Sequence, residues 1–214
     1  MTIIFDLDGT LLNTIDDLGY ACNHALEQAG YPTHPIEAYP EKVGNGINNL
    51  IRRALPEGDR TEENILQVRE FFVPYYDAHN CDYTRPYEGI PELLAALKRQ
   101  GHRLAVASNK YQAATEKIVS HYFPGIFAVI LGERAGVERK PDPQIVYDIR
   151  AALPGEALYI GDSLVDMETA RNAGVPFVAC SWGFVSRDQL LHAGVEHIAD
   201  RAEEILGGVK RRCG

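Results

Sequence analysis

Five short apolar runs recur along this chain, and each is bounded by turn-forming or charged residues. Nearly continuous apolar runs of this length are typical of strands that are buried on both faces of a parallel sheet. A helical pattern precedes each of the last four runs. This alternation predicts a doubly wound, mainly parallel α/β sheet, whose ligands bind beyond the carboxyl ends of the strands. The expected strands are residues 2–5, 103–107, 127–131, 157–160 and 177–180, and the expected helices are residues 90–100, 112–122, 143–153 and 164–173.

Residues 14–84 interrupt the alternation, because they contain helical patterns but no convincing strand. We expect them to form a helical cap domain inserted after the first strand, with residues 1–13 and 85–214 forming the α/β core. The two junctions would then act as hinges, so that movement of the cap excludes water and admits substrate. Pro74 lies inside the third helical pattern and predicts a kink or break there. The helical patterns cover residues 16–29, 41–54 and 62–78.

The chain of 214 residues is acidic, with a formal net charge of -9. This balance disfavours broad contact with nucleic acid or an anionic membrane. No stretch approaches the roughly 20 apolar residues of a membrane helix, and the start has no charged leader followed by a long apolar run. We therefore expect a cytoplasmic protein. Its expected oligomeric state is a monomer or a homodimer. The cysteines are scattered, with no C-x-x-C pair and no histidine at zinc spacing, so we expect reduced thiols.

The first apolar run leads into the sequence DLDGTL at residues 6–11. Alternate residues of a strand face the same way, so Asp6 and Asp8 can address one pocket beyond the strand tip. Two carboxylates this close need a cation between them or a proton on one of them. We therefore predict a bound Mg²⁺-type ion, with Asp6 as the nucleophile that attacks phosphorus and Asp8 as the general acid and base. For such a pair taken alone, a turn or cap role is the alternative.

Two further strand ends supply groups suited to a phosphate. Ser108 follows the second apolar run, so its hydroxyl and the amide of Asn109 are placed to hold phosphate oxygens at a helix start. A simple N-cap role is open for Ser108. Thr10, whose hydroxyl can fix the loop after Asp8, is placed in the same phosphate-binding group. Lys140 precedes the stiff Pro141-Asp142-Pro143 frame, which suits a lysine that neutralises phosphoryl oxygens and restrains Asp6.

An acidic motif, GDSLVD, follows the strand expected at residues 157–160. Asp162 would complete the Mg²⁺ site as a hard oxygen ligand, together with Asp6 and the main-chain carbonyl of Asp8. Asp166 has two possible roles. It contacts a metal-bound water or Lys140, or it only caps the next helix, since Ser163 and Asp166 have the spacing of a capping box.

These four elements, in this order, resemble the motifs of the haloacid dehalogenase superfamily, in its magnesium-dependent phosphatase branch. The resemblance spans nearly the whole chain and implies a Rossmann-like core with an inserted cap. It also implies that Asp6 is the nucleophile, Asp8 the acid and base, Ser108 a phosphate ligand, Lys140 a charge stabiliser and Asp162 the metal anchor. The resemblance does not imply dehalogenation, because sites of the dehalogenase branch are metal-free and lack the second acidic residue, which is Asp8 in this chain.

Residues in and near the predicted cap indicate the class of substrate. Residues 43–46 (VGNG) and 87–90 (YEGI) look like those of phosphoglycolate phosphatases. Gly44 would let the cap backbone approach a small substrate and Asn45 could hydrogen-bond to it, although an ordinary helix-starting loop is the alternative. Arg52 or Arg53 could recognise a substrate carboxylate, and neither is assigned. The resemblance implies hydrolysis of a small phosphomonoester, with 2-phosphoglycolate as the leading choice, through an aspartyl-phosphate intermediate.

Other activities of the same core remain open. A pyrophosphatase or a nucleotide or sugar-phosphate phosphatase could carry this cap. A β-phosphoglucomutase-like mutase fits less well, because residues 46–49 lack the arginine of the caps it resembles. A phosphonate-cleaving relative needs a cap lysine, and Lys42 lies on the wrong side of Gly44. An inactive phosphate-sensing or scaffold protein is the alternative outside enzymes, and the intact charged motifs argue against it.

Overall fold

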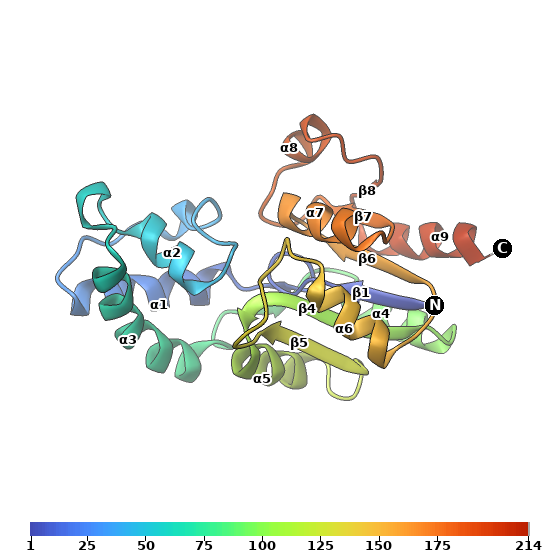
Figure 1. The fold of residues 1–214 in the computed structure, drawn as a ribbon, viewed down its shortest axis with the longest axis horizontal. Coiled ribbons are helices and arrows are strands. Elements are labelled where there is room, and N and C mark those ends of the chain that lie inside the picture. Colours follow the sequence, from blue (N-terminus) through green and yellow to red (C-terminus); the bar gives the residue numbers. More distant parts are fainter. Residues whose placement is uncertain (214) are drawn as a thin grey trace. The chain divides into compact units, whose positions relative to one another are not determined.

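The protein is described by a computed structural model that covers residues 1–213, with side chains described for residues 1–207. The chain forms two compact units (Figure 1). Unit 1 contains Met1–Asn13 and the chain from Pro86 onward, and unit 2 contains Thr14–Arg85. Among the described residues, no helix combines the length and apolar character needed to cross a membrane.

Unit 1 is built on a six-stranded sheet with the strand order β5-β4-β1-β6-β7-β8. Strand β1 lies between β4 and β6, where Ile4 is opposite Ala105 and Tyr159 in parallel register. The other described pairings in this sheet are also parallel, so the predicted doubly wound α/β core is confirmed. The strands are β1 (Thr2–Phe5), β4 (Arg103–Tyr111), β5 (Val129–Glu133), β6 (Ala157–Gly161), β7 (Phe177–Cys180) and β8 (Ile198–Ala199).

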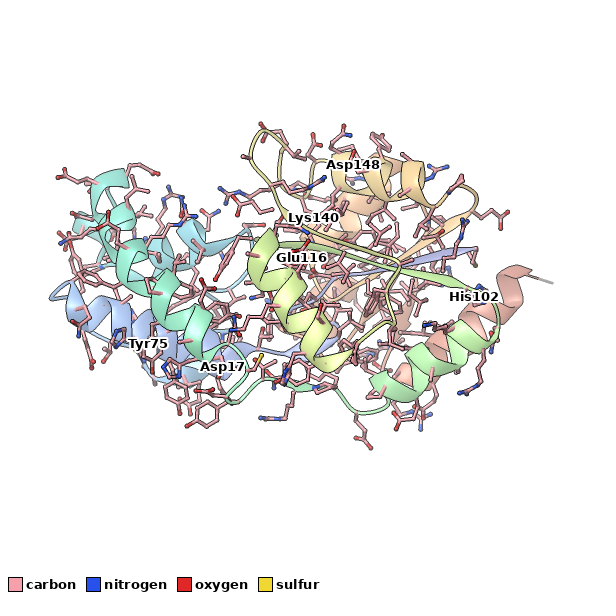
Figure 2. The ribbon with its side chains drawn as sticks, turned by 90° about the horizontal axis from the view of Figure 1, so that it is seen from below. Asp17, Tyr75, His102, Glu116, Lys140 and Asp148 are labelled. Atoms are coloured by element: carbon pink, nitrogen blue, oxygen red, sulfur yellow. The ribbon has the colours of Figure 1, made fainter. Side chains whose placement is uncertain are left out.

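Helices cover both faces of this sheet, with α6 and α7 on one face and α4 and α9 on the other (Figures 1 and 2). The first pair shows why the fold forms. Ile145, Val146 and Ile149 make a helical stripe on α6 that packs onto the buried side chains of Ile4 and Tyr159. The helices of unit 1 are α4 (Ile90–Arg99), α5 (Gln112–Tyr122), α6 (Gln144–Ala152), α7 (Leu164–Ala173), α8 (Arg187–His192) and α9 (Ala202–Cys213).

Unit 2 consists mainly of the helices α1 (Ile15–Gln28), α2 (Ile47–Ala54) and α3 (Glu62–His79). Short strands β2 (Leu12–Asn13) and β3 (Arg85–Pro86) pair in a two-stranded sheet at the two chain junctions. Helix α2 begins six residues later than expected from residue 41. Gly44, Asn45 and Gly46 have φ angles of 99°, 62° and 82°, and such left-handed residues cannot continue a right-handed helix.

Helix α3 runs through Pro74 without a break, so of the kink or break predicted there, the break is wrong. Proline removes one hydrogen bond from a helix interior. Phe72 and Tyr76, on either side of it, are fully buried. Their packing holds the helix together across the missing bond, because tertiary burial supplies most helical stability in proteins.

One buried carboxylate of unit 2 belongs to none of the predicted motifs. Asp17 lies on α1 and is labelled in Figure 2. Its two carboxylate oxygens accept the backbone N–H groups of Tyr83 and Thr84 at 3.0 and 2.9 Å. Asp17 therefore fixes the end of unit 2 that leads back towards β3.

The cysteines with described side chains form no disulfide. Cys22, Cys81 and Cys180 are free, and the side chain of Cys213 lies outside the described residues. Burial raises the pKa of the Cys22 thiol to about 12. Cys22 is therefore held as an unreactive neutral thiol within unit 2.

Candidate active site

The carboxyl ends of the three central strands bring the predicted motifs together in unit 1. Asp6 follows β1, Ser108 lies near the end of β4, and Asp162 follows β6. These strands are adjacent in the sheet, so residues separated by more than 150 positions share one edge. Ligands of doubly wound folds bind at this edge.

Lys140 lies at the centre of this edge and is almost fully buried. Its Nζ is 2.9 Å from Asp6 Oδ1 and 2.7 Å from Asp166 Oδ1. It also donates hydrogen bonds to the carbonyl of Ala107 at 2.9 Å and to the hydroxyl of Tyr159 at 3.1 Å. Four acceptors from four segments therefore fix one ammonium group. Tyr159 was not predicted, because an aromatic residue inside an apolar strand gives no sequence signal of a polar role.

Three buried carboxylates gather around this lysine. Ligand oxygens of Asp6, Asp162 and Asp166 all lie within 4.8 Å of one another. Burial, reinforced by repulsion from Asp166, raises the pKa of Asp6 well above its ordinary value and that of Asp162 to about 7. Burial alone would lower the pKa of Lys140, but Asp166 and Asp6 outweigh it and raise that pKa.

When all three carboxylates are ionised, the cluster carries more negative charge than the single buried ammonium group of Lys140 can neutralise. Hard oxygen donors at short mutual distances are the ligands of Mg²⁺, Mn²⁺ and Ca²⁺. A divalent cation would remove the repulsion that raises the pKa values of Asp6 and Asp162. The residues present thus fit a hard divalent cation.

Asp162 is held rigidly by groups from two distant segments. Its Oδ1 accepts a hydrogen bond from Thr10 Oγ1 at 3.1 Å, and its Oδ2 accepts one from the Phe184 backbone N–H at 2.8 Å. Gly9, with a φ of 84°, and Gly183 leave room for this carboxylate, since a Cβ at either position would collide with it. The Thr10 hydroxyl, predicted in the phosphate-binding group, thus binds the carboxylate of Asp162, the residue predicted to hold the metal.

Asp166 both caps its helix and contacts Lys140, two roles that the sequence presented as alternatives. Its backbone N–H donates to Ser163 Oγ at 3.2 Å, and its Oδ2 accepts from the Ser163 N–H at 3.2 Å, which is a capping box at the start of α7. Its Oδ1 accepts from Lys140 Nζ. One carboxylate therefore fixes both the helix start and the lysine.

Ser108 does not lie at a helix start as expected. Strand β4 continues to Tyr111, with an irregular register between Ala107 and Tyr111, and α5 begins only at Gln112. The Ser108 hydroxyl accepts a hydrogen bond from the Lys110 backbone N–H at 3.1 Å. Ser108 is thus a buried residue within β4 rather than an N-cap, and it lies where the pairing of β4 with β5 is irregular.

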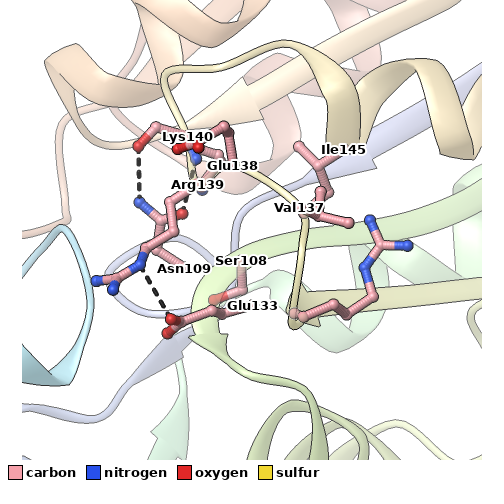
Figure 3. Close-up of a pocket in the computed structure, with 10 residues that line it drawn as sticks. Ser108, Asn109, Glu133, Val137, Glu138, Arg139, Lys140 and Ile145 are labelled. Carbon is pink, nitrogen blue, oxygen red and sulfur yellow. Dashed lines mark hydrogen bonds and ion pairs between the residues drawn. The ribbon is translucent and has the colours of Figure 1, made fainter.

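The Asn109 side chain makes two hydrogen bonds to the backbone of Lys140 (Figure 3). Its amide nitrogen donates to the Lys140 carbonyl at 3.1 Å, and its amide oxygen accepts the Lys140 N–H at 2.9 Å. Both residues line a small pocket beside the ion pair of Arg139 and Glu133, whose charged atoms are 3.0 Å apart. Asn109 therefore fixes the loop that carries Lys140.

Asp8 faces a lysine that sequence reasoning missed. Lys110 Nζ lies 3.1 Å from Asp8 Oδ2, and the Lys110 side chain is only 4% exposed. A signal for it was present, since Lys110 is two positions beyond Ser108 and alternate residues of a strand face the same side. Asp6 and Asp8 thus contact different lysines.

The predicted cap residues Gly44 and Asn45 belong to unit 2, whereas every other predicted site residue belongs to unit 1. Arg53 Nη1 donates to the carbonyls of Lys42 and Val43 at 3.1 and 2.9 Å. Arg53 therefore stabilises the backbone of the glycine-rich loop. Arg52 donates to Asn49 Oδ1 at 2.7 Å and pairs with Glu62 at 3.3 Å.

The parallel sheet and the buried carboxylate–lysine cluster at its edge define a doubly wound α/β protein with an acidic site that fits a divalent cation. Residues 3–180 match the model of the haloacid dehalogenase-like hydrolases, and the chain belongs to this family. The resemblance inferred from the motifs is thereby confirmed.

Named relatives lie within the same family. The chain is 35% identical to a phosphoglycolate phosphatase of Cereibacter sphaeroides over 190 residues, covering 85% of each chain. It is 31% identical to a phosphoglycolate phosphatase of Haemophilus influenzae over 212 residues, covering 94% of this chain and 95% of the relative. Its structure is similar to the crystal structure of a proposed phosphoglycolate phosphatase from Lactobacillus delbrueckii, with a TM-score of 0.90, 35% identity and 95% of each chain covered.

Proposed function

We propose that this protein is a Mg²⁺-dependent phosphatase that hydrolyses a small phosphomonoester, with 2-phosphoglycolate as the leading substrate. The observation that carries the proposal is the buried cluster in which Asp6 contacts Lys140 at 2.9 Å beside Asp162 and Asp166. A nucleophilic carboxylate with a fixed ammonium group beside it suits attack on a phosphoryl group. The names of the relatives support phosphoglycolate.

In this proposal Asp6 attacks phosphorus and becomes an aspartyl-phosphate, while the bond from phosphorus to the ester oxygen breaks. Asp8 gives its proton to the leaving oxygen and then takes one from the water that hydrolyses the intermediate. Lys140 neutralises charge on the phosphoryl oxygens, and the Ser108 hydroxyl binds one of them. The covalent intermediate divides one difficult displacement into two easier ones. The side chains that act in both are held in position before the reaction starts.

Asp6, Asp162 and the main-chain carbonyl of Asp8 would hold the Mg²⁺ ion, with Asp166 supporting the site through Lys140. The bound ion would supply positive charge that offsets the carboxylates and the phosphoryl oxygens. Buried carboxylates with raised pKa values support this assignment, because they have most to gain from a cation.

Addition of Mg²⁺ to EDTA-treated protein is expected to raise its melting temperature by about 5–10 °C at a Mg²⁺ concentration of about 100 times the Kd. Mg²⁺ binds the ionised carboxylates, and the pKa of Asp162 in the folded metal-free protein is about 7. The Kd of Mg²⁺ should therefore rise as the pH falls below 7. Isothermal titration calorimetry at pH 8 and pH 5.5 checks this, and equal affinities at both values contradict it.

A substitution of Asn109 by alanine is expected to lower kcat about ten- to a hundredfold with little change in KM. Asn109 holds the Lys140 backbone from both sides, and small misplacements of a charged group cost rate of this size. Steady-state kinetics with Gln67→Ala, which removes an exposed amide side chain on α3, as the control measures the effect. A rise in KM with unchanged kcat would instead favour direct binding of substrate by Asn109.

We also propose that Gly44 and Asn45 contact the bound substrate, and that the partner of the protein is a small phosphorylated metabolite. The net charge of -9 supports a metabolite over nucleic acid. We further propose a cytoplasmic location and a monomeric or homodimeric state for the protein.

A hydrolysis screen tests the proposed function. Purified protein with Mg²⁺ is assayed for phosphate release from 2-phosphoglycolate, sugar phosphates, nucleotides and pyrophosphate. The expected result is a kcat/KM for 2-phosphoglycolate that exceeds the others at least about tenfold. Equal and weak rates on all substrates would reject phosphoglycolate, and a marked preference for pyrophosphate or a nucleotide would replace it with that substrate.

A further inference from the structure

The connection between β7 and α8, residues 181–186, contacts the candidate cation site, although none of the predicted motifs includes it. The Phe184 backbone N–H donates to Asp162 Oδ2 at 2.8 Å. The indole Nε1 of Trp182 donates to the backbone carbonyl of Thr10 at 3.0 Å. The connection therefore contacts both a predicted metal ligand and the loop that follows β1.

Thr10 is held at two of its polar groups. Its hydroxyl donates to Asp162 Oδ1 at 3.1 Å, and its carbonyl accepts the indole hydrogen bond. The hydrogen bonds close a ring that runs from Trp182 through Thr10 and Asp162 to Phe184, and returns along the backbone through Gly183. Members of a closed network restrain one another more than the members of an open chain do.

The connection is itself anchored and closely packed. The Ser181 backbone N–H donates to the carbonyl of Ala199 on β8 at 3.0 Å. A Cβ at Gly183 would collide with the side chain of Asp162 and with the carbonyl of Gly9, so the backbone lies directly against both. A segment that is fixed in this way can hold the groups that it contacts in place.

This restraint bears on two of the proposed Mg²⁺ ligands. One is the Asp162 carboxylate, and the other is the main-chain carbonyl of Asp8, which lies in the same loop as Thr10. Groups that orient the ligands of a metal contribute to its affinity, because they fix the ligand oxygens before the ion binds. A hydrogen bond to the Thr10 carbonyl limits how far this loop can move.

We propose that Trp182 is a positioning residue of the cation site. Its indole N–H fixes the loop after β1, and thereby holds the Asp8 carbonyl and the Asp162 carboxylate in the arrangement that binds Mg²⁺. This inference rests on the proposed Mg²⁺-dependent function and adds a residue outside the predicted motifs to it. Trp182 is also the only tryptophan in the chain, so its emission reports directly on this loop.

The first measurement needs no variant. EDTA-treated wild-type protein is titrated with Mg²⁺ while the tryptophan emission is recorded, and the same titration is followed by isothermal titration calorimetry. We expect the emission to change and to saturate with the calorimetric Kd, since the ion binds groups that are linked to the indole. Unchanged emission at Mg²⁺ concentrations that saturate the calorimetric signal overturns the inference.

The second measurement uses Trp182→Phe, which keeps an aromatic ring and removes the N–H donor. We expect the Kd of Mg²⁺ to rise about tenfold, as is usual when a partner of a metal ligand is lost. The melting temperature in EDTA is recorded for the same protein, because a purely structural role would lower this temperature and leave the Kd unchanged. Tyr20→Phe removes a polar hydrogen from an exposed aromatic side chain of unit 2, and should change neither value.

The outcomes separate this inference from the proposed function. Equal Kd values for wild type and Trp182→Phe overturn the role of Trp182 and leave the Mg²⁺-dependent phosphatase standing. A wild type that binds no Mg²⁺ overturns both. Absence of phosphate release from every phosphomonoester rejects the phosphatase function, whereas Mg²⁺ binding that depends on Trp182 still supports the inference. If Trp182→Phe does not fold, the wild-type emission decides.

Discussion

The substitution Asp6→Asn is expected to reduce phosphate release by at least about a thousandfold, because an amide cannot form the aspartyl-phosphate. The shape of the side chain is kept, and so is the contact between Lys140 and Asp166. Burial and repulsion raise the pKa of Asp6, so the ionised carboxylate weakens the metal-free fold at neutral pH. We therefore expect the metal-free variant to be at least as stable as the wild type at pH 8.

Two measurements make this prediction specific. Phosphate release is measured with saturating Mg²⁺, and the melting temperature is measured in EDTA and again in Mg²⁺. The Asn variant should also lose most of the Mg²⁺-induced stabilisation, since a neutral ligand replaces an anionic one. Asp188→Asn on the exposed face of α8 is the matched control and should change none of these values. Substantial activity in a well-folded Asp6→Asn protein would contradict the covalent mechanism.

The substitution Lys140→Met is expected to abolish activity and also to destabilise the metal-free protein by about 3–5 kcal/mol, the usual cost of removing one partner from a buried ion pair. Without the ammonium group, Asp6 and Asp166 remain buried with no cation from this side chain. The deficit should shrink as the pH falls, because protonation of Asp6, whose pKa is raised by burial, removes its uncompensated charge. It should be largest above pH 7, where Asp162, with a pKa of about 7, is also ionised.

Urea unfolding of the wild type and the variant in EDTA, at pH 8 and pH 5, checks this prediction. Lys117→Met, an exposed lysine on α5, is the matched control and should unfold like the wild type. A pH-independent deficit would mean that the lysine acts through packing of its alkyl chain rather than through charge. A variant of unchanged stability would show that the cluster does not need the ammonium group.

Much of the fold could be predicted from local sequence patterns. Parallel strands that are buried on both faces are nearly continuous apolar runs, so β1, β6 and β7 were found with almost correct bounds. Turn chemistry was less informative. The start of α2 was misplaced because three successive left-handed residues were not recognised, and the break at Pro74 was wrong because burial of Phe72 and Tyr76 overrides local preference.

The site was predicted unevenly for a related reason. Asp6, Asp8, Lys140 and Asp162 stand in motifs with a distinctive local frame, and the structure brings all four to one edge of the sheet. Tyr159 and Lys110 have no such frame. Their contacts arise from packing of segments that are far apart in the chain, so the partner of each side chain is seen only in the structure.

The sequence by itself determined the class of fold, the four charged motifs and membership of the family, because these depend on periodicity and on short motifs. Only the tertiary structure decided which charges meet. In the structure Asp166 contacts Lys140 in addition to capping its helix, and Lys110 contacts Asp8. The physical reason is that a buried charge is stabilised by whichever opposite charge lies within about 4 Å, and such distances are set by packing between distant segments rather than by neighbours in the chain.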